Sequence, residues 1–193
     1  PFPIPAAWPR FRAIDFGYNN AFVCLWGAVS HDDELYIYRE LYETERLVSD
    51  LGPQIRQLSE GERILATVAD HDAENRAELN KHGIPTLAAR QEIVEGIQEV
   101  RRRLERDKRG KARLYVMRDA TVARDSRLAI RNRPMSTQEE FGVYQYPQTM
   151  EGRARREEPS DLDNHGMDAL RYLVMFLRHR SAMGVRWRRA EGI

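Results

Sequence analysis

Residues 11–41 read FRAIDFGYNNAFVCLWGAVSHDDELYIYREL and contain three apolar segments separated by two polar turns. In the first segment Phe11, Ala13 and Asp15 share one face, because side chains alternate along an extended strand. The turns are Tyr-Asn-Asn and His-Asp-Asp-Glu, which are typical of connections between strands. Three consecutive strands joined by short turns predict an antiparallel meander.

Beyond this meander, helical and extended patterns alternate along the chain. We expect helices over 44–61, with Thr44 as cap and a kink or break at Pro53, and over 73–83, 92–110 and 124–134. Strands are expected over 63–70, 84–89 and 112–120, residues 140–147 look extended, and a final helix begins between 160 and 163. This order predicts an α/β domain in which helices flank a mixed sheet. The expected organisation is a proline-rich linker over 1–10, one domain over 11–180 and a basic tail over 181–193.

Composition limits the class of protein. The chain has 193 residues, 31 basic and 30 acidic, so a formal net charge of +1 points to no particular partner. Its one cysteine, Cys24, can form no internal disulfide, lies in an apolar run and is interpreted as a buried thiol. No apolar stretch reaches the roughly 20 residues that span a bilayer, so we expect no membrane association.

Three aspartates lie where catalytic groups are expected. Asp15 and Asp70 each follow an apolar strand, and the carboxyl edge of a sheet is a common place for a cleft. A turn or a helix cap is an equally simple explanation for either residue. Asp168 borders the apolar face of the final helix, beyond the capping position if that helix starts by residue 163. A carboxylate beside a core is costly without a cation.

A divalent metal would explain the three acids together. Carboxylates in one pocket raise each other's pKa, and a bound cation removes that penalty. Hard oxygen donors favour Mg²⁺ or Mn²⁺ over zinc, and the sequence has no Cys/His cluster with zinc spacing. Two such ions, about 3.5–4 Å apart, hydrolyse phosphodiesters by activating water and stabilising the leaving oxygen. The aspartates therefore predict a two-metal hydrolytic site.

Four segments carry a resemblance to a known family: FRAIDFGYNN (11–20), VADHDAENRAEL (68–79), EIVEGIQEVRRRL (92–104) and PSDLDNHGMDALRYL (159–173). Together they resemble the C-terminal nuclease domain of the large terminase subunit of tailed bacteriophages, in the RNase H-like superfamily. The resemblance covers about residues 8–177, and DNHGMDALRY is its most distinctive part. It implies that Asp15 is shared by both metals, that Asp70 binds one and that Asp168 binds the other.

His165 matches a histidine that approaches a metal in some members of that family. Its offset of three from Asp168 puts both side chains on one helical face. The alternative is that His165 does not bind the metal itself but forms a hydrogen bond to a residue that does. We interpret Asp72 and Asp163 either as acids that lie behind the metal-binding residues or simply as helix caps. Gly166 predicts a close approach of the final helix to a strand.

The sequence departs from the family in two respects. Before the Gly-Ile of the long helix the family commonly carries a lysine, whereas this chain has AARQEI and offers Arg90. It also lacks a G-x-x-x-x-G-K-[ST] phosphate-binding loop. We therefore expect the ATPase motor to be a partner outside this chain. The resemblance further implies double-stranded DNA, the small terminase subunit and the portal protein as partners, in the cytoplasm of the infected host.

Basic residues supply the candidates for DNA contact. Phosphate contacts give salt-dependent affinity that does not depend on sequence. RDKRGKAR (106–113), a glycine turn between basic arms, is interpreted as a hairpin or loop over the cleft, whereas a solvated helix face explains 101–103 equally well. The candidates are Arg90, Arg101, Arg102, Lys108, Arg109, Lys111, Arg153 and Arg155.

The function expected from these observations is metal-dependent endonucleolytic cleavage of double-stranded DNA during viral DNA packaging. Two alternatives stay open. One is a Holliday-junction resolvase or ribonuclease of the same superfamily, and the other is a non-catalytic module that docks on DNA or on a portal.

Overall fold

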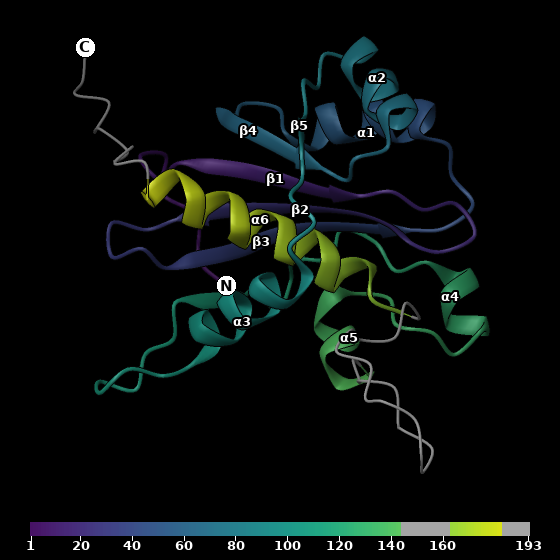
Figure 1. Ribbon diagram of the computed structural model, residues 1–193. Coiled ribbons are helices and arrows are strands. Elements are labelled where there is room, and N and C mark those ends of the chain that lie inside the picture. The colour runs from purple at the N-terminus through teal and green to yellow at the C-terminus, as the bar shows by residue number, and fades with distance from the viewer. Residues whose placement is uncertain (144–162, 183–193) are drawn as a thin grey trace.

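The computed structural model describes residues 1–143 and 163–182 (Figure 1). Within these residues six strands form one sheet: β1 Arg10–Asp15, β2 Phe22–Val29, β3 Leu35–Glu43, β4 Ile64–Ala69, β5 Leu87–Ala88 and β6 Leu114–Val116. The helices are α1 Val48–Leu58, α2 Ala73–Lys81, α3 Ile93–Leu104, α4 Ser126–Ile130, α5 Thr137–Val143 and α6 His165–Ala182.

The strand order is β5-β4-β1-β2-β3-β6. β1, β2 and β3 pair antiparallel, as the meander predicts, whereas β4 lies parallel to β1, β5 parallel to β4, and β6 parallel to β3. The predicted fold class, a mixed sheet flanked by helices, is confirmed. Because β1 and β4 are parallel neighbours, their carboxyl ends meet at one edge of the sheet.

Each face of the sheet has its own apolar core. α6 and α3 cover one face, where Phe11 and Ala13 of β1 pack with Leu170 and Leu173 of α6. α1 and α2 cover the other, where Leu51 and Ile55 pack against Trp26, the single cysteine Cys24 and neighbouring apolar residues of the sheet. Alternation along β1 therefore turns Asp15, like Phe11 and Ala13, toward α6.

Cys24 lies at the centre of the second core and is fully buried. Burial raises the pKa of its thiol to about 12, so the thiolate hardly forms at neutral pH. The interpretation of Cys24 as a buried thiol is confirmed. In the described part of the chain no helix is long and apolar enough to cross a membrane.

The start of α6 differs from the prediction. Asp163 has a φ of 55° and cannot be helical, so the helix begins at His165 and not between 160 and 163. Gly166 approaches the start of α5 and not a strand, because a Cβ there would collide with Thr137. Asp168 consequently lies in the first turn of α6.

Residues 140–143 are also not extended but form the end of α5, where Glu140 is fully buried and accepts hydrogen bonds from Tyr42, Gly166 and Met167. The Tyr144–Pro147 part of that prediction lies outside the described residues. α1 continues through Pro53.

Thr44 does not cap α1, whose N-cap is Leu47 without a side-chain bond. Thr44 instead gives its backbone N–H and its hydroxyl to Asp125 Oδ2, both at 2.7 Å. Asp125 also caps α4 by accepting the N–H of Arg127 at 2.9 Å. These three bonds, which we call the Asp125 latch, fasten the end of β3 to α4.

Candidate active site

Asp15 and Asp70 lie side by side at the carboxyl edge of the sheet. Asp15 is the last residue of β1, and Asp70 follows β4 directly and donates its backbone N–H to Ile14 O at 3.0 Å. Asp15 is 6% exposed. Two acids from neighbouring parallel strands are therefore delivered to one edge, as expected where such sheets carry a site.

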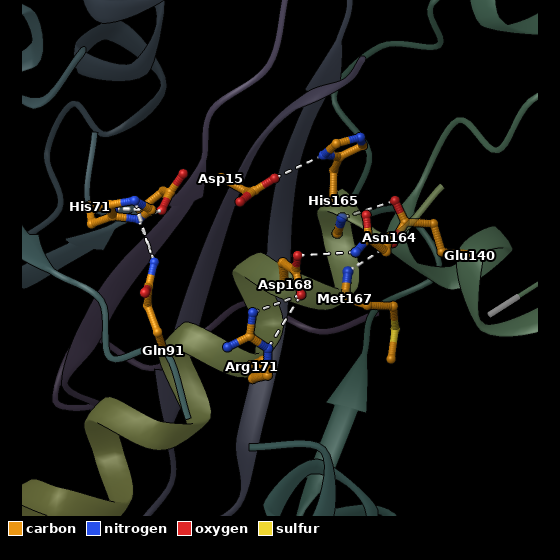
Figure 2. Close-up of polar contacts among 11 residues, drawn as sticks. Asp15, His71, Gln91, Glu140, Asn164, His165, Met167, Asp168 and Arg171 are labelled. Carbon is orange, nitrogen blue, oxygen red and sulfur yellow. Dashed lines mark hydrogen bonds and ion pairs between the residues drawn. The ribbon is translucent and has the colours of Figure 1, made fainter. Parts of the chain in front are cut away.

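The first turn of α6 meets this edge. His165 Nδ1 lies 2.9 Å from Asp15 Oδ2. Figure 2 marks this contact with a dashed line. One turn further on, the charge of Asp168 raises the pKa of Asp15, so the two carboxylates lie within electrostatic range of each other. The carboxyl ends of β1 and β4 and the first turn of α6, which are far apart in sequence, thus lie together.

Tyr172 reports the convergence of all three acids. Burial raises the pKa of its phenol, and the charges of Asp15, Asp168 and Asp70 raise it further. The ring is 7% exposed and packs against the guanidinium of Arg171, at 4.8 Å from the ring centre. The phenol therefore stays protonated at neutral pH beside three carboxylates.

Burial raises the pKa of Asp15 to about 6, and the charges of Asp168 and Asp70 add to the rise. The hydrogen bond with His165 opposes it but does not cancel it. For His165, burial alone would lower the pKa, but the bond to Asp15 and the charges of Asp15, Glu140 and Asp168 raise it overall. The ionised form of Asp15 is therefore unfavourable at this edge, and a bound cation would stabilise it.

Each acid also has protein partners. Asp70 Oδ1 accepts the backbone N–H of His71 and lies 2.5 Å from its ring, which in turn contacts Gln91 Nε2 at 2.7 Å. Asp168 pairs with Arg171 Nη2 at 2.9 Å. The cation predicted beside Asp168 is thus an arginine in this arrangement.

Asp168 also accepts a hydrogen bond from Asn164 Nδ2 at 3.2 Å. By contrast, Asp15 Oδ1 and Asp70 Oδ2 accept no hydrogen bond from any described residue.

The donor set fits a hard divalent cation in its chemistry, because these are carboxylate oxygens whose crowding raises the pKa of Asp15. As the side chains stand, no group of three or more His, Cys, Asp or Glu among the described residues is gathered tightly enough to hold an ion. Binding would therefore require the carboxylates to turn away from His71 and Arg171. His165 Nε2 is buried and unpartnered within the described part of the chain.

Glu140 is a residue of this site that the sequence analysis missed. It is fully buried and accepts the N–H groups of Gly166 at 2.9 Å and Met167 at 2.8 Å, so it caps α6 (Figure 2). The Tyr42 hydroxyl donates to it at 2.6 Å. Burial raises the pKa of Glu140 to about 7. Nothing in the local sequence marks it, because its role depends on α5 meeting α6.

Arg171 was also missed, although its offset of three from Asp168 was a signal for an ion pair. A Cβ on Gly96 of α3 would collide with the Arg171 side chain, so this glycine gives the arginine its space between the two helices.

The basic candidates separate into two groups. Arg90 lies next to Gln91 at the acidic edge and is exposed. Arg101 and Arg102, at the end of α3, and Lys108, Arg109 and Lys111, in the following loop, are exposed as well. Arg153 and Arg155 lie outside the described residues, as does the tail from 183 onward.

The loop over 106–113 does not lie over the cleft. It leads into β6, where Leu114 pairs with Leu35 at the start of β3, whereas Glu43 at the other end of β3 pairs with Phe22, near Asp15. The distance along β3 from Leu35, beside the loop, to Glu43, near Asp15, is roughly 26 Å at ~3.3 Å per residue. Figure 1 shows this loop at the end opposite the start of α6. Arg103, unlike its neighbours, is buried and paired with Glu99 and Asp33.

Solved structures of phage large terminases are similar to this chain. The nuclease domain of P22 large terminase matches with a TM-score of 0.67 and 18% identity, over 92% of this chain and 86% of that one. The chain has the fold of a large terminase nuclease domain. The predicted resemblance is therefore confirmed at the level of the fold.

Two further structures agree with this assignment. One is the large terminase of a thermophilic bacteriophage, which matches with a TM-score of 0.69 and 18% identity, over 92% of this chain and 41% of that one. The other is the large terminase nuclease of thermophilic phage G20c, with a TM-score of 0.54 and 17% identity, over 86% and 80%. The chain thus spans less than half the length of the first of these two proteins. No family model and no curated protein matches the sequence.

Proposed function

We propose that this chain is a divalent-metal-dependent endonuclease that hydrolyses phosphodiester bonds of double-stranded DNA, as the nuclease part of a phage packaging terminase. The observation that carries the proposal is the meeting of Asp15, Asp70 and Asp168 at one sheet edge, where burial and mutual repulsion hold the pKa of Asp15 near 6. An acid cluster of this kind costs stability unless a cation binds there.

Asp15 would hold both of two Mg²⁺ or Mn²⁺ ions, with Asp70 on one and Asp168 on the other. Such ions supply an activated water and stabilise the leaving oxygen. Asp15 Oδ1 and Asp70 Oδ2, which accept no hydrogen bond from any described residue, are available to an ion, whereas Asp168 would first have to turn away from Arg171. Arg171 balances the charge of Asp168 before an ion binds, and the hydrogen bond from His165 orients Asp15.

The remaining residues would position DNA. Arg90 at the acidic edge is suited to a phosphate near the cleaved bond. Arg101, Arg102, Lys108, Arg109 and Lys111 lie roughly 26 Å away, a span of about 8 base pairs at ~3.4 Å each. They would therefore grip the same duplex at a distance from the cut. In the full packaging machine the partners would be an ATPase motor, the small terminase subunit and the portal.

The test is nicking of a supercoiled plasmid by purified protein with Mn²⁺ or Mg²⁺. Asp70→Asn and Asp168→Asn should each lose cleavage by at least roughly 10³-fold, because each removes a metal ligand. Asp72→Asn is the matched control, since Asp72 is two residues from Asp70 but caps α2 through Asn75 N–H, a role that asparagine can fill. Plasmid nicking that survives in the Asp168→Asn protein would reject the assignment.

Two further measurements separate the alternatives. Calorimetric titration of Mn²⁺ should give binding that disappears in Asp15→Asn, whereas a docking module would bind no Mn²⁺ through these acids. Rates on linear duplex, a four-way junction and an RNA–DNA hybrid should favour the duplex. A preference for the junction or the hybrid would move the assignment to a resolvase or a ribonuclease.

A further inference from the structure

A small cavity is lined in part by His165, and Asp15 is not among its lining residues. It has a volume of about 50 Å³ and is bounded by the β1–β2 turn, the segment after α4 and the residues just before α6. One water needs roughly 10–15 Å³ of such space, so the cavity has room for a tetrahedral anion of phosphate size. Its polar lining is Asn19, Asn20, Arg131, Arg133, Asp163 and His165.

The two arginines keep free donors in this cavity. Arg133 binds Asp163 through Nε, and Arg131 binds Glu45 through Nη2, while each guanidinium has five N–H groups. Within the described residues the other nitrogens of both side chains make no hydrogen bond. Each arginine is paired with one carboxylate, Glu45 or Asp163, and its unbonded N–H groups are what the cavity offers to an anion.

The amides of two asparagines add to this preference, whereas the neutral His165 ring, with Nδ1–H on Asp15, offers only an acceptor at Nε2. The side chains of Asn19 and Asn20 have no hydrogen-bond partner among the described residues, so their amide N–H groups are available. His165 Nε2, on the side of the ring away from Asp15 (Figure 2), is buried and also unpartnered there. A buried polar atom without a partner marks a place where a polar group or an ordered water is expected.

We infer that this cavity, the Arg131–Arg133 pocket, binds one phosphate of the DNA strand that is cut, next to the phosphate attacked at Asp15. The inference rests on the proposed function and adds to it a way of fixing the strand. His165 touches both places, so the pocket lies one side chain away from Asp15. Arg90 lies on the opposite side, beyond Asp70, so the strand would cross the sheet edge between them.

The experiment measures binding of a 30-base-pair duplex by fluorescence anisotropy without divalent metal, between 50 and 200 mM KCl. Each phosphate contact contributes ~0.9 to the slope of log affinity against log salt. The Arg131→Gln/Arg133→Gln protein should lose about one unit of slope and bind roughly tenfold more weakly at 50 mM. With metal, its KM for cleavage should rise while kcat stays within about threefold.

Two controls separate phosphate binding from a structural effect. Arg124 is an exposed arginine paired with Glu139 outside the pocket, so Arg124→Gln should keep the wild-type slope. Asp163→Asn breaks the ion pair with Arg133 but leaves both arginines, so it should bind DNA as tightly as wild type or more tightly.

Three results would overturn the inference. One is an unchanged slope in the double variant, and another is an Asp163→Asn protein that binds DNA as weakly as the double variant, which would mean that the Arg133–Asp163 pair only supports the fold. In both cases cleavage by wild type would leave the proposed function standing. A wild-type chain that neither binds nor cuts duplex DNA would remove the proposed function as well.

Discussion

Asp15 and Asp125 are both buried aspartates, 6% and 9% exposed, yet their surroundings act on them in opposite directions. In the Asp125 latch, burial alone would raise the pKa, but three hydrogen bonds from Thr44 and Arg127 bring it below its usual value. At the sheet edge, Asp15 has one bond, to His165, and two acidic neighbours, and its pKa rises to about 6.

Folding stabilises the ionised form of Asp125 and destabilises the ionised form of Asp15. At Asp125 the three donors stabilise the ionised carboxylate enough to outweigh its burial. A carboxylate such as Asp15, with one hydrogen bond and two acidic neighbours, would be further stabilised by a bound cation. Burial alone does not distinguish Asp15 from Asp125, which differ in the number of hydrogen bonds that they accept and in their acidic neighbours.

The largest expected difference is in cleavage. Asp15→Asn should reduce plasmid nicking by at least roughly 10³-fold, because it removes the acid common to both proposed metal positions. Asp125→Asn should retain wild-type nicking within about threefold when assayed well below its melting temperature. Equal losses in two folded proteins, checked by circular dichroism, would show that Asp15 has no role in cleavage that Asp125 lacks.

The next difference is in the stability of the latch. Asp125→Asn should lower the free energy of unfolding by about 3 kcal/mol, because it replaces a charged acceptor of three hydrogen bonds by a neutral one and puts N–H against N–H. Urea denaturation at pH 7.5 in EDTA measures this. A change below about 0.5 kcal/mol would show that the latch does not hold β3 to α4.

Asp15→Asn should act on stability with the opposite sign. A pKa raised from 3.8 to about 6 means that ionisation opposes folding, so stability from this group is full below about pH 4 and is lost as pH rises through 6. Removing the charge should therefore stabilise the metal-free protein at pH 7.5 by about 2 kcal/mol. Added Mn²⁺ should raise the Tm of wild type but not of the variant. A variant that is less stable than wild type in EDTA would contradict the view that ionised Asp15 opposes folding.

Glu140 differs from Asp125, since it also accepts three hydrogen bonds but has a pKa raised to about 7. It is fully buried, so the loss of solvation outweighs its donors. Stability from this group is present below about pH 4.5 and is lost as pH rises through 7. In EDTA, Glu140→Gln should remove about 1–2 kcal/mol of the fall in stability between pH 5 and 7, and an unchanged pH profile would count against it.

Much of this fold could be predicted because its signals are local. The alternation in 11–41 predicts the meander and turns Asp15 to the same face as Phe11 and Ala13, and the apolar run before Asp70 predicts a central strand. The failures are tertiary. Thr44 has the sequence of a helix cap but binds Asp125, 81 residues away.

The candidate site follows the same division. The three aspartates and His165 could be selected from the sequence, because strand ends and helical spacing are local properties. Glu140 could not, since it acts only after α5 meets α6, and the loop over 106–113 was assigned to the wrong end because strand register cannot be seen in one sequence.

The chain's single thiol, Cys24, is sealed beneath α1 in a core that must open before a reagent can reach it. A thiol-reactive dye will therefore react at a rate set by rare opening of that core rather than by surface chemistry. The labelling rate of this one sulfur atom in the native protein therefore measures how often the core opens. It can be compared between the Asp125→Asn and Asp15→Asn proteins without denaturant.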